Sequence, residues 1–264
     1  MVARPILKSP EELDKMRAAG RVVAEALRLV ESMIAPRVDT LALDEAVEAH
    51  IRRCGGVPAF KGYPNPQAGV RPFPASICAS INEEVVHGIP ARGRRLAEGD
   101  LVSVDVGVEL EGLFGDAAWT FSVGAPVRKT RKLLEAGREA LERGVAAMQP
   151  NARLAEVSRA IQACAQSHKF EVVRKFVGHG IGRAMHEPPQ VPNYATRRFP
   201  DRSVRLAPGA VLALEPMLNA GTGDVQVLED GWTVVTRDRK PSVHFEHTVA
   251  VLEHGTEVFT DLKG

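Results

Sequence analysis

Cysteine, long apolar runs and net charge are all scarce in this sequence, and each scarcity excludes a class of protein. The chain has 264 residues and three cysteines, Cys54, Cys78 and Cys164, with no C-x-x-C pair. An odd number without that spacing argues against a disulfide framework and against a structural zinc knuckle, and it fits a reducing compartment. We therefore expect a cytoplasmic protein.

Membrane and nucleic-acid partners are excluded on similar grounds. No stretch of about 18 apolar residues is present to form a membrane span, and the start, MVARPILKSPEELDKM, lacks the apolar run of a secretory signal. The 34 basic and 33 acidic residues leave a formal net charge of +1. Binding to nucleic acid or to an anionic membrane calls for a basic excess, so we expect neither.

Helix, loop and strand signals alternate along the chain. Ser9, Pro10 and Glu12 form a helix start with a capping box, and the apolar periodicity that follows predicts a helix to about residue 33. Similar patterns predict helices over about 41–53, 129–147 and 153–168. The proline-rich stretch 61–74 predicts a loop, and the part after residue 171 reads mostly as strands and turns.

A β-hairpin is predicted in the middle of the chain. LVSVDVGVEL alternates strictly, a Glu-Gly turn follows, and LFGDAAWTFSV returns. A register set by this turn places Asp105 opposite Ala118 and Asp116 opposite Gly107. The two aspartates then lie diagonally on one face of the hairpin.

The chain also resembles itself. LAEGDLVSVDV (96–106) matches LAPGAVLALEP (206–216), VVHGI (85–89) matches VGHGI (177–181), and the segment after Pro36 matches the one after Pro150. Each half has the order helix, Pro, helix, H-G-I, strand. We therefore expect one duplicated domain over 1–264, with halves of about 1–125 and 126–264.

The repeat gives four carboxylates related positions. It superposes Asp105 on Glu215 and brings Asp116 opposite Glu246. A salt bridge with Lys or Arg is the ordinary explanation for one acidic residue in a strand. Four buried carboxylates repel one another, so they share protons or bind cations. No Lys or Arg recurs beside them in both halves, which favours cations.

Two histidines lie in the Gly-rich stretch VGHGIGRAMHEPP, at His179 and His186. A lone histidine is more often a satisfied surface or core residue than a ligand. Two that are flanked by Gly and Pro are typical of an active-site loop. One imidazole with four carboxylates suits Mn²⁺, Fe²⁺, Co²⁺ or Zn²⁺, and two bridged ions are the arrangement of two-metal hydrolases.

These residues carry a family resemblance. The chain resembles a type I methionine aminopeptidase, the short bacterial form without an N-terminal zinc-binding extension. The resemblance covers nearly the whole chain and is carried by KSPEELDKMRAAG, SICASINEEVVHGIP, VDVGVELEGLFGDAAWTFSVG, GHGIGRAMHEPPQVPNY, LEPMLNAG, DGWTVVTRDR and FEHTVAV. It implies the pita-bread fold, an α/β (α+β) arrangement in which helices cover an antiparallel sheet with an internal pseudo-two-fold repeat. The implied activity is hydrolytic removal of the N-terminal (initiator) methionine from nascent proteins when the second residue is small.

The resemblance also implies a dimetal site. Two divalent ions, Co, Mn, Fe or Zn, would make hydroxide available near pH 7 and would polarise the scissile carbonyl. Asp116 and Glu246 would bridge both ions. By resemblance the ligands are Asp105, Asp116, His179, Glu215 and Glu246.

Three residues receive catalytic roles from the resemblance. Glu215 would also shuttle protons, His87 would contact the scissile amide, and His186 would hold the carbonyl oxygen. The predicted methionine pocket comprises Phe73, Cys78, Met185 and Trp232. Plain core packing is the alternative for these four, and Cys78 is not needed as a nucleophile in a metal mechanism.

Three departures from the family pattern affect the site. The stretch FKGYPNPQAGVRPF is longer than usual and lacks the small-loop histidine, so the rim of the substrate pocket does not follow from the resemblance. Met185 replaces a common Phe, and His244 replaces a usual Gln. We hypothesise that His244 lies beside the metal ligands and titrates near pH 6–7. A solvent-exposed histidine at a strand end is the alternative.

Two other functions fit the same fold. An X-Pro peptidase would carry a further N-terminal domain, whereas Asp105 lies early in this chain, and a non-enzymatic relative would have lost ligands. The expected partner is the N-terminal Met of nascent polypeptides, and transient ribosome association fits such processing. We expect a monomer.

Overall fold

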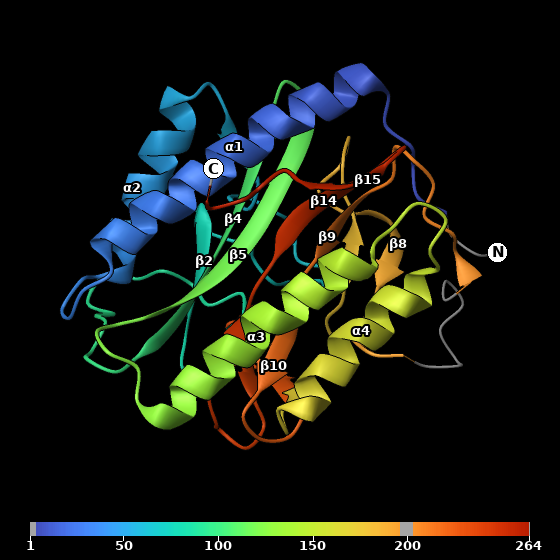
Figure 1. The fold of residues 1–264 in the computed structure, drawn as a ribbon. Helices are drawn as coiled ribbons and strands as arrows, with labels where there is room; N and C mark the ends of the chain where they lie inside the picture. The colour runs from blue at the N-terminus through green and yellow to red at the C-terminus, as the bar shows by residue number, and fades with distance from the viewer. Residues whose placement is uncertain (1–3, 196–202, 264) are drawn as a thin grey trace.

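Two helix pairs pack against antiparallel strands (Figure 1). The computed structural model describes residues 4–195 and 203–263, so the outer ends of the expected 1–264 unit lie outside the described residues. The four expected helices are confirmed, each to within one residue at either end. They are α1 (Pro10–Met33), α2 (Thr40–Arg53), α3 (Arg128–Ala147) and α4 (Leu154–Ser167).

The start of α1 shows the predicted capping box. The hydroxyl of Ser9 accepts from the backbone N–H of Glu12, and the Glu12 carboxylate accepts from the N–H of Ser9. The inner face of α1, with Met16, Val23 and Leu27, is fully buried. No helix of the described ranges is long and apolar enough to cross a membrane.

The strands are short except for one long hairpin. In the described part of the chain they are β1 (Val57–Pro58), β2 (Ile77–Ile81), β3 (Glu84–Val86), β4 (Leu101–Leu110), β5 (Leu113–Ser122), β6 (Glu171–Val172), β7 (Gly178–Gly180), β8 (Glu187–Val191), β9 (Val211–Leu214), β10 (Met217–Asn219), β11 (Val225–Val227), β12 (Val234–Thr236), β13 (Ser242–His244), β14 (His247–Leu252) and β15 (Gly255–Val258).

The hairpin of β4 and β5 has the predicted register. Asp105 pairs with Ala118 and Asp116 pairs with Gly107, so both aspartates project from the same face. The alternate residues Val102, Val104, Val106 and Val108 are fully buried on the opposite face. That face packs against α1 and α2, and its burial leaves the aspartate face directed to the middle of the molecule.

The internal repeat is visible in the strand pairing, with one correction. In the first half β4 lies between β2 and β5, and in the second half β9 lies between β7 and β14. If Asp105 is placed on Glu215, Ser80 falls on His179, because Ser80 pairs with Ser103 and His179 pairs with Ala213. The sequence match of VVHGI with VGHGI is therefore wrong as a structural alignment.

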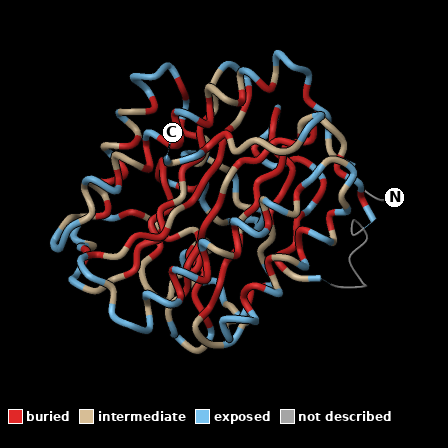
Figure 2. Tube along the Cα trace, in the orientation of Figure 1, coloured by how far each residue is buried: buried red, intermediate tan, exposed pale blue. Residues whose placement is uncertain are grey.

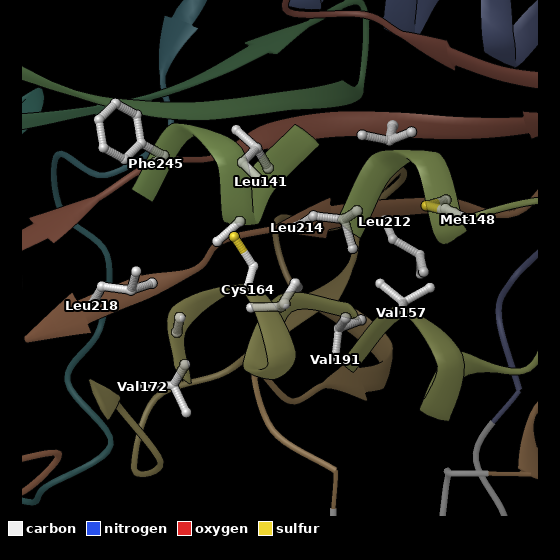
Figure 3. Close-up of a cluster of buried hydrophobic side chains, with 14 of the residues drawn as sticks. Leu141, Met148, Val157, Cys164, Val172, Val191, Leu212, Leu214, Leu218 and Phe245 are labelled. Atoms are coloured by element: carbon white, nitrogen blue, oxygen red, sulfur yellow. The ribbon is translucent and has the colours of Figure 1, made fainter. Parts of the chain in front are cut away.

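Buried side chains concentrate along the strands and on the inner faces of the helices (Figure 2). One hydrophobic cluster joins α1 and α2 to β4 and β5, and another joins α3 and α4 to β9, β10 and β13. Figure 3 shows the second cluster, in which Leu141, Leu214 and Phe245 are buried together. Each such side chain contributes about 1.5–3 kcal/mol. Phe245 thereby holds the segment that carries His244 and Glu246.

Candidate functional site

Four acidic side chains from different segments of the chain meet where the two halves adjoin. Asp105 lies in β4, Asp116 in β5, Glu215 directly after β9, and Glu246 between β13 and β14. The backbone N–H of Glu246 donates to the carbonyl of Ala118 at 2.8 Å. This bond places the last carboxylate beside the hairpin of the first half.

A threonine joins the two halves at the same place through two hydrogen bonds. The hydroxyl of Thr248, in β14, accepts from the backbone N–H of Asp116 at 3.0 Å and donates to its carbonyl at 2.8 Å. Both backbone groups of Asp116 are thus satisfied by the second half of the chain. The side-chain carboxylate of Asp116 is therefore not needed to satisfy its own backbone groups and is free to face the site.

The carboxylates are buried, and several of their oxygen atoms lack a hydrogen-bond partner. Oδ1 of Asp105, Oδ1 of Asp116 and Oε1 of Glu246 have no hydrogen-bond partner. Burial raises the pKa of Asp105 to about 7. Burial, followed by repulsion from neighbouring carboxylates, raises the pKa of the other three groups well above the ordinary value. Within the described ranges, the basic side chains within 4.0 Å of these acids are histidines alone.

His179 presents one ring nitrogen to these acids. Its Nδ1–H donates to the carbonyl of Gly180 at 2.9 Å, which leaves the lone pair on Nε2. Nε2 lies 3.8 Å from Oδ2 of Asp116 and 3.8 Å from Oε1 of Glu215. Burial lowers the pKa of His179 to about 3. Donor atoms of Asp116, His179 and Glu246 all lie within 4.8 Å of one another, a geometry that fits a divalent cation.

His244 lies beside these groups, as hypothesised, but its expected titration is wrong. Its Nε2 is 3.8 Å from Oε2 of Glu215 and 3.7 Å from Oε2 of Glu246. The side chain is buried, so the exposed strand-end alternative is also wrong. Burial lowers the pKa of His244 to about 3, so the ring is neutral near pH 6–7.

Every residue predicted for the site lines one cavity of about 480 Å³. The predicted residues in its wall are Phe73, Cys78, His87, Asp105, Asp116, His179, Met185, His186, Glu215, Trp232 and Glu246. Phe73 and Trp232 meet edge to face, with ring centroids 5.2 Å apart. The structure thus brings acids, histidines and apolar residues to a single concave surface.

Sequence reasoning missed one wall of this cavity. Phe60, Tyr63 and the segment 64–66 also line it. The loop 61–74 is closed by backbone bonds between Phe73 and Gly62 and between Phe73 and Tyr63. Asn65 Nδ2 donates to the carbonyl of Gly231 at 2.9 Å, which ties the loop to the turn before Trp232. The unusual length of this loop in the sequence indicated that the rim differs from the family pattern. It did not indicate that the loop folds over the cavity.

His87 and His186, which are expected to contact the substrate, occupy defined positions in the cavity wall. The hydroxyl of Tyr63 lies 2.7 Å from Nδ1 of His186, and the ring centroids of His186 and His179 are 4.2 Å apart. His87 has a left-handed backbone, with φ of 60°, and its ring packs edge-on against Phe176. Burial lowers the pKa of both, that of His87 to about 4. Both rings are therefore neutral at pH 7.

A buried ion pair supports the loop that carries Met185 and His186. Lys8 Nζ lies 2.6 Å from Oε2 of Glu187, and both side chains are almost fully buried. Oε1 of Glu187 accepts from the backbone N–H of Arg183 at 2.7 Å. The segment before α1 thus fixes a loop far away in sequence. Sequence reasoning missed this pair because nothing in the local pattern links residues so far apart.

Comparisons with known proteins agree with this geometry. A family model described as metallopeptidase family M24 matches residues 14–253. Methionine aminopeptidase 1 of Bacillus subtilis (strain 168) is 46% identical over 255 residues, covering 97% of this chain and 98% of that protein. Methionine aminopeptidase 1 of Mycobacterium tuberculosis is 47% identical over 259 residues, covering 96% and 94%.

Solved structures show the same architecture. The methionine aminopeptidase of Rickettsia prowazekii superposes with a TM-score of 0.91 at 37% identity, covering 97% of this chain and 100% of that chain. The prolidase of Pyrococcus furiosus, at 22% identity, superposes with a TM-score of 0.76 over 97% of this chain and 66% of its own, which shows the fold alone. The expected pita-bread fold is confirmed. The chain belongs to metallopeptidase family M24.

Proposed function

We propose that this protein is a methionine aminopeptidase, which hydrolyses the first peptide bond of nascent proteins and releases the initiator methionine when the second residue is small. One observation carries the proposal. Buried, incompletely satisfied carboxylates and His179 line the same cavity as an apolar pocket of suitable chemistry. Similarity to methionine aminopeptidases over nearly the whole chain supports it.

The donor set fits two divalent ions. The orphaned carboxylate oxygens and their raised pKa values mark a site whose negative charge lacks compensation. Oxygen donors with one imidazole suit Co, Mn, Fe or Zn. The bound ions would supply Lewis acidity, which activates water and polarises the scissile carbonyl. The residues proposed to hold them are Asp105, Asp116, His179, Glu215 and Glu246.

The neighbouring residues would orient the peptide and move protons. We infer that the hydroxyl of Tyr63, 2.7 Å from Nδ1 of His186, donates to that nitrogen. The ring proton would then reside on Nε2, which could donate to the carbonyl oxygen of the scissile bond. His87, neutral at pH 7, would contact the nitrogen of that bond. The carboxylate of Glu215, whose pKa is raised, would hold the proton on its way to the leaving amine.

The methionine side chain would occupy the apolar part of the cavity. Phe73 and Trp232 supply aromatic edges that attract a thioether sulfur, and Met185 offers an adaptable wall. Burial and nearby carboxylates raise the pKa of Cys78 well above its ordinary value. Cys78 therefore stays a thiol and serves as a wall rather than as a nucleophile.

We propose further that residues 1–264 act as one catalytic domain, as a cytoplasmic monomer that meets nascent chains in transient contact with the ribosome. The free cysteines support a reducing compartment. Sedimentation of the purified protein tests the monomer.

Peptide hydrolysis tests the activity. With Co²⁺ or Mn²⁺ we expect cleavage of Met-Gly peptides and no cleavage of Gly-Pro peptides, and a chelator should abolish the reaction. Asp116→Asn and Glu246→Gln should lose more than about 100-fold in kcat, because each removes a carboxylate proposed to hold the ions, and even an outer-shell partner is worth about 10–100-fold. Cleavage that persists in the chelator, or preference for Gly-Pro, would contradict the proposal.

A further inference from the structure

A thiol, an imidazole and a carboxylate converge on the surface between α1 and α2, apart from the cavity. His50 lies in the last turn of α2, Cys54 caps that helix, and Glu25 reaches them from α1. Nε2 of His50 is 3.3 Å from Oε2 of Glu25 and 3.7 Å from Sγ of Cys54. The three donor atoms all lie within 4.8 Å of one another.

These separations match the edges of a metal tetrahedron. Bonds of about 2.0–2.1 Å to N or O and about 2.3 Å to S, at tetrahedral angles, separate N from O by about 3.3 Å and N from S by about 3.6 Å. A charge-assisted hydrogen bond between imidazole and carboxylate would be about 2.7–2.9 Å. One ring nitrogen also cannot both donate to Glu25 and accept from Cys54. The separation of His50 from Glu25 is therefore longer than such a hydrogen bond and equals the edge length of the tetrahedron.

The second helix pair offers an internal comparison. Glu139, Cys164 and His168 occupy the corresponding places with equal spacings along the chain, but with Cys and His exchanged. There Nε2 of His168 lies 2.5 Å from Oε2 of Glu139. The two atoms are directly hydrogen-bonded, so no ion fits between them. Cys164 is buried in the core shown in Figure 3, and burial raises its pKa to about 11. This second cluster is therefore an ion pair beside a core thiol.

We propose that Glu25, His50 and Cys54 bind one divalent ion of the zinc class, with water completing the tetrahedron. On binding, the thiol of Cys54 releases its proton to solvent and a metal–sulfur bond forms, with no change of oxidation state. Cys54 is exposed, so ions reach it directly from solvent. Thiolate and imidazole select Zn²⁺ or Co²⁺ over Mn²⁺. The ion ties α1 to α2 and is independent of the proposed dimetal site.

Cobalt spectroscopy distinguishes this site from the cavity. The proposed dimetal ligands are oxygen and nitrogen, so a near-ultraviolet thiolate-to-Co²⁺ absorption band reports a cysteine ligand. We expect the Co²⁺-loaded protein to show the band, Cys54→Ser to lose it, and Cys164→Ser and Cys78→Ser to retain it. A parent protein without the band, or a band lost in Cys78→Ser and kept in Cys54→Ser, overturns the proposal.

Ion counting gives a second measurement. Equilibrium dialysis against Zn²⁺ should show one ion fewer per chain in His50→Gln and in Cys54→Ser than in the parent. His168→Gln is the matched control in the second helix pair and should bind as many ions as the parent. Circular dichroism confirms that the variants are folded. Equal zinc content in parent and His50→Gln contradicts the proposal.

Discussion

At the scale of single residues, the site depends on protons held in particular places. Three histidines of the site are neutral because burial lowers the pKa of each, to about 3 for His179 and His244 and about 4 for His87. Neutral imidazoles have one donor and one acceptor nitrogen. The hydrogen bond made by one ring nitrogen therefore decides whether the proton lies on that nitrogen or on the other one.

Tyr63 is expected to set that choice for His186. Tyr63→Phe removes the hydroxyl that lies 2.7 Å from Nδ1 and leaves the ring in place. The proton can then move to Nδ1, and Nε2 loses its ability to donate to the carbonyl oxygen. We expect kcat to fall about 10- to 100-fold with little change in KM, measured on a Met-Gly peptide.

Phe60→Leu provides the control, because it alters the same wall and leaves the hydroxyl of Tyr63 in place. An unchanged kcat in Tyr63→Phe would show that the hydroxyl does not position His186.

At the scale of elements, a residue from the segment before α1 holds the loop that precedes β8. Lys8, in the segment before α1, meets Glu187, and the Lys8 side chain packs so closely over Gly182 that a Cβ there would overlap it. The loop that carries Met185 and His186 is thus anchored by a residue from the other end of the chain.

Breaking this buried pair should be costly. Lys8→Met leaves the Glu187 carboxylate buried without its cation, and we expect a loss of about 3–5 kcal/mol in the free energy of unfolding. The double variant Lys8→Met with Glu187→Gln should recover part of that loss. Denaturant midpoints measure both.

Lys15→Gln is the control, because it breaks the exposed pair of Lys15 with Glu11 and should change stability by less than about 1 kcal/mol. If Lys8→Met is as mild as this control, the buried pair does not anchor the loop.

At the scale of the whole molecule, two similar halves enclose the site. The N–H of Glu246 and the hydroxyl of Thr248 join the second half to the hairpin of the first. The carboxylates contributed by the two halves repel one another there. Without metal, this repulsion opposes the association of the halves, so global stability depends on pH.

The raised pKa values of the carboxyl groups determine how stability changes with pH. Carboxylates whose folded pKa is raised stabilise the protonated folded state, so stability falls as pH rises toward and through the folded pKa, about 7 for Asp105. The buried histidines act oppositely, but only below their unfolded pKa of about 6.5. We therefore expect chelated protein to lose melting temperature as pH rises above about 6.5, and Asp105→Asn to flatten the slope up to about pH 7, where Asp105 loses its proton in the folded state. A slope that is unchanged in this variant would contradict the assignment.

The sequence by itself determined the local elements and the type of chemistry. Capping residues, apolar period and turn residues act over a few positions, so the helices and the register of Asp105 against Ala118 follow from neighbours in the chain. Family motifs indicated the donor residues in the same way. Both kinds of signal are contained in short stretches.

Only the tertiary structure decided what surrounds those residues. The pairing of Lys8 with Glu187, the fold of loop 61–74 over the cavity and the contacts of His244 join segments distant in sequence. The alignment of His179 with Ser80 rather than His87 depends on strand register. Burial and the pKa shifts it causes are properties of the assembled core, because desolvation arises from all packed neighbours together.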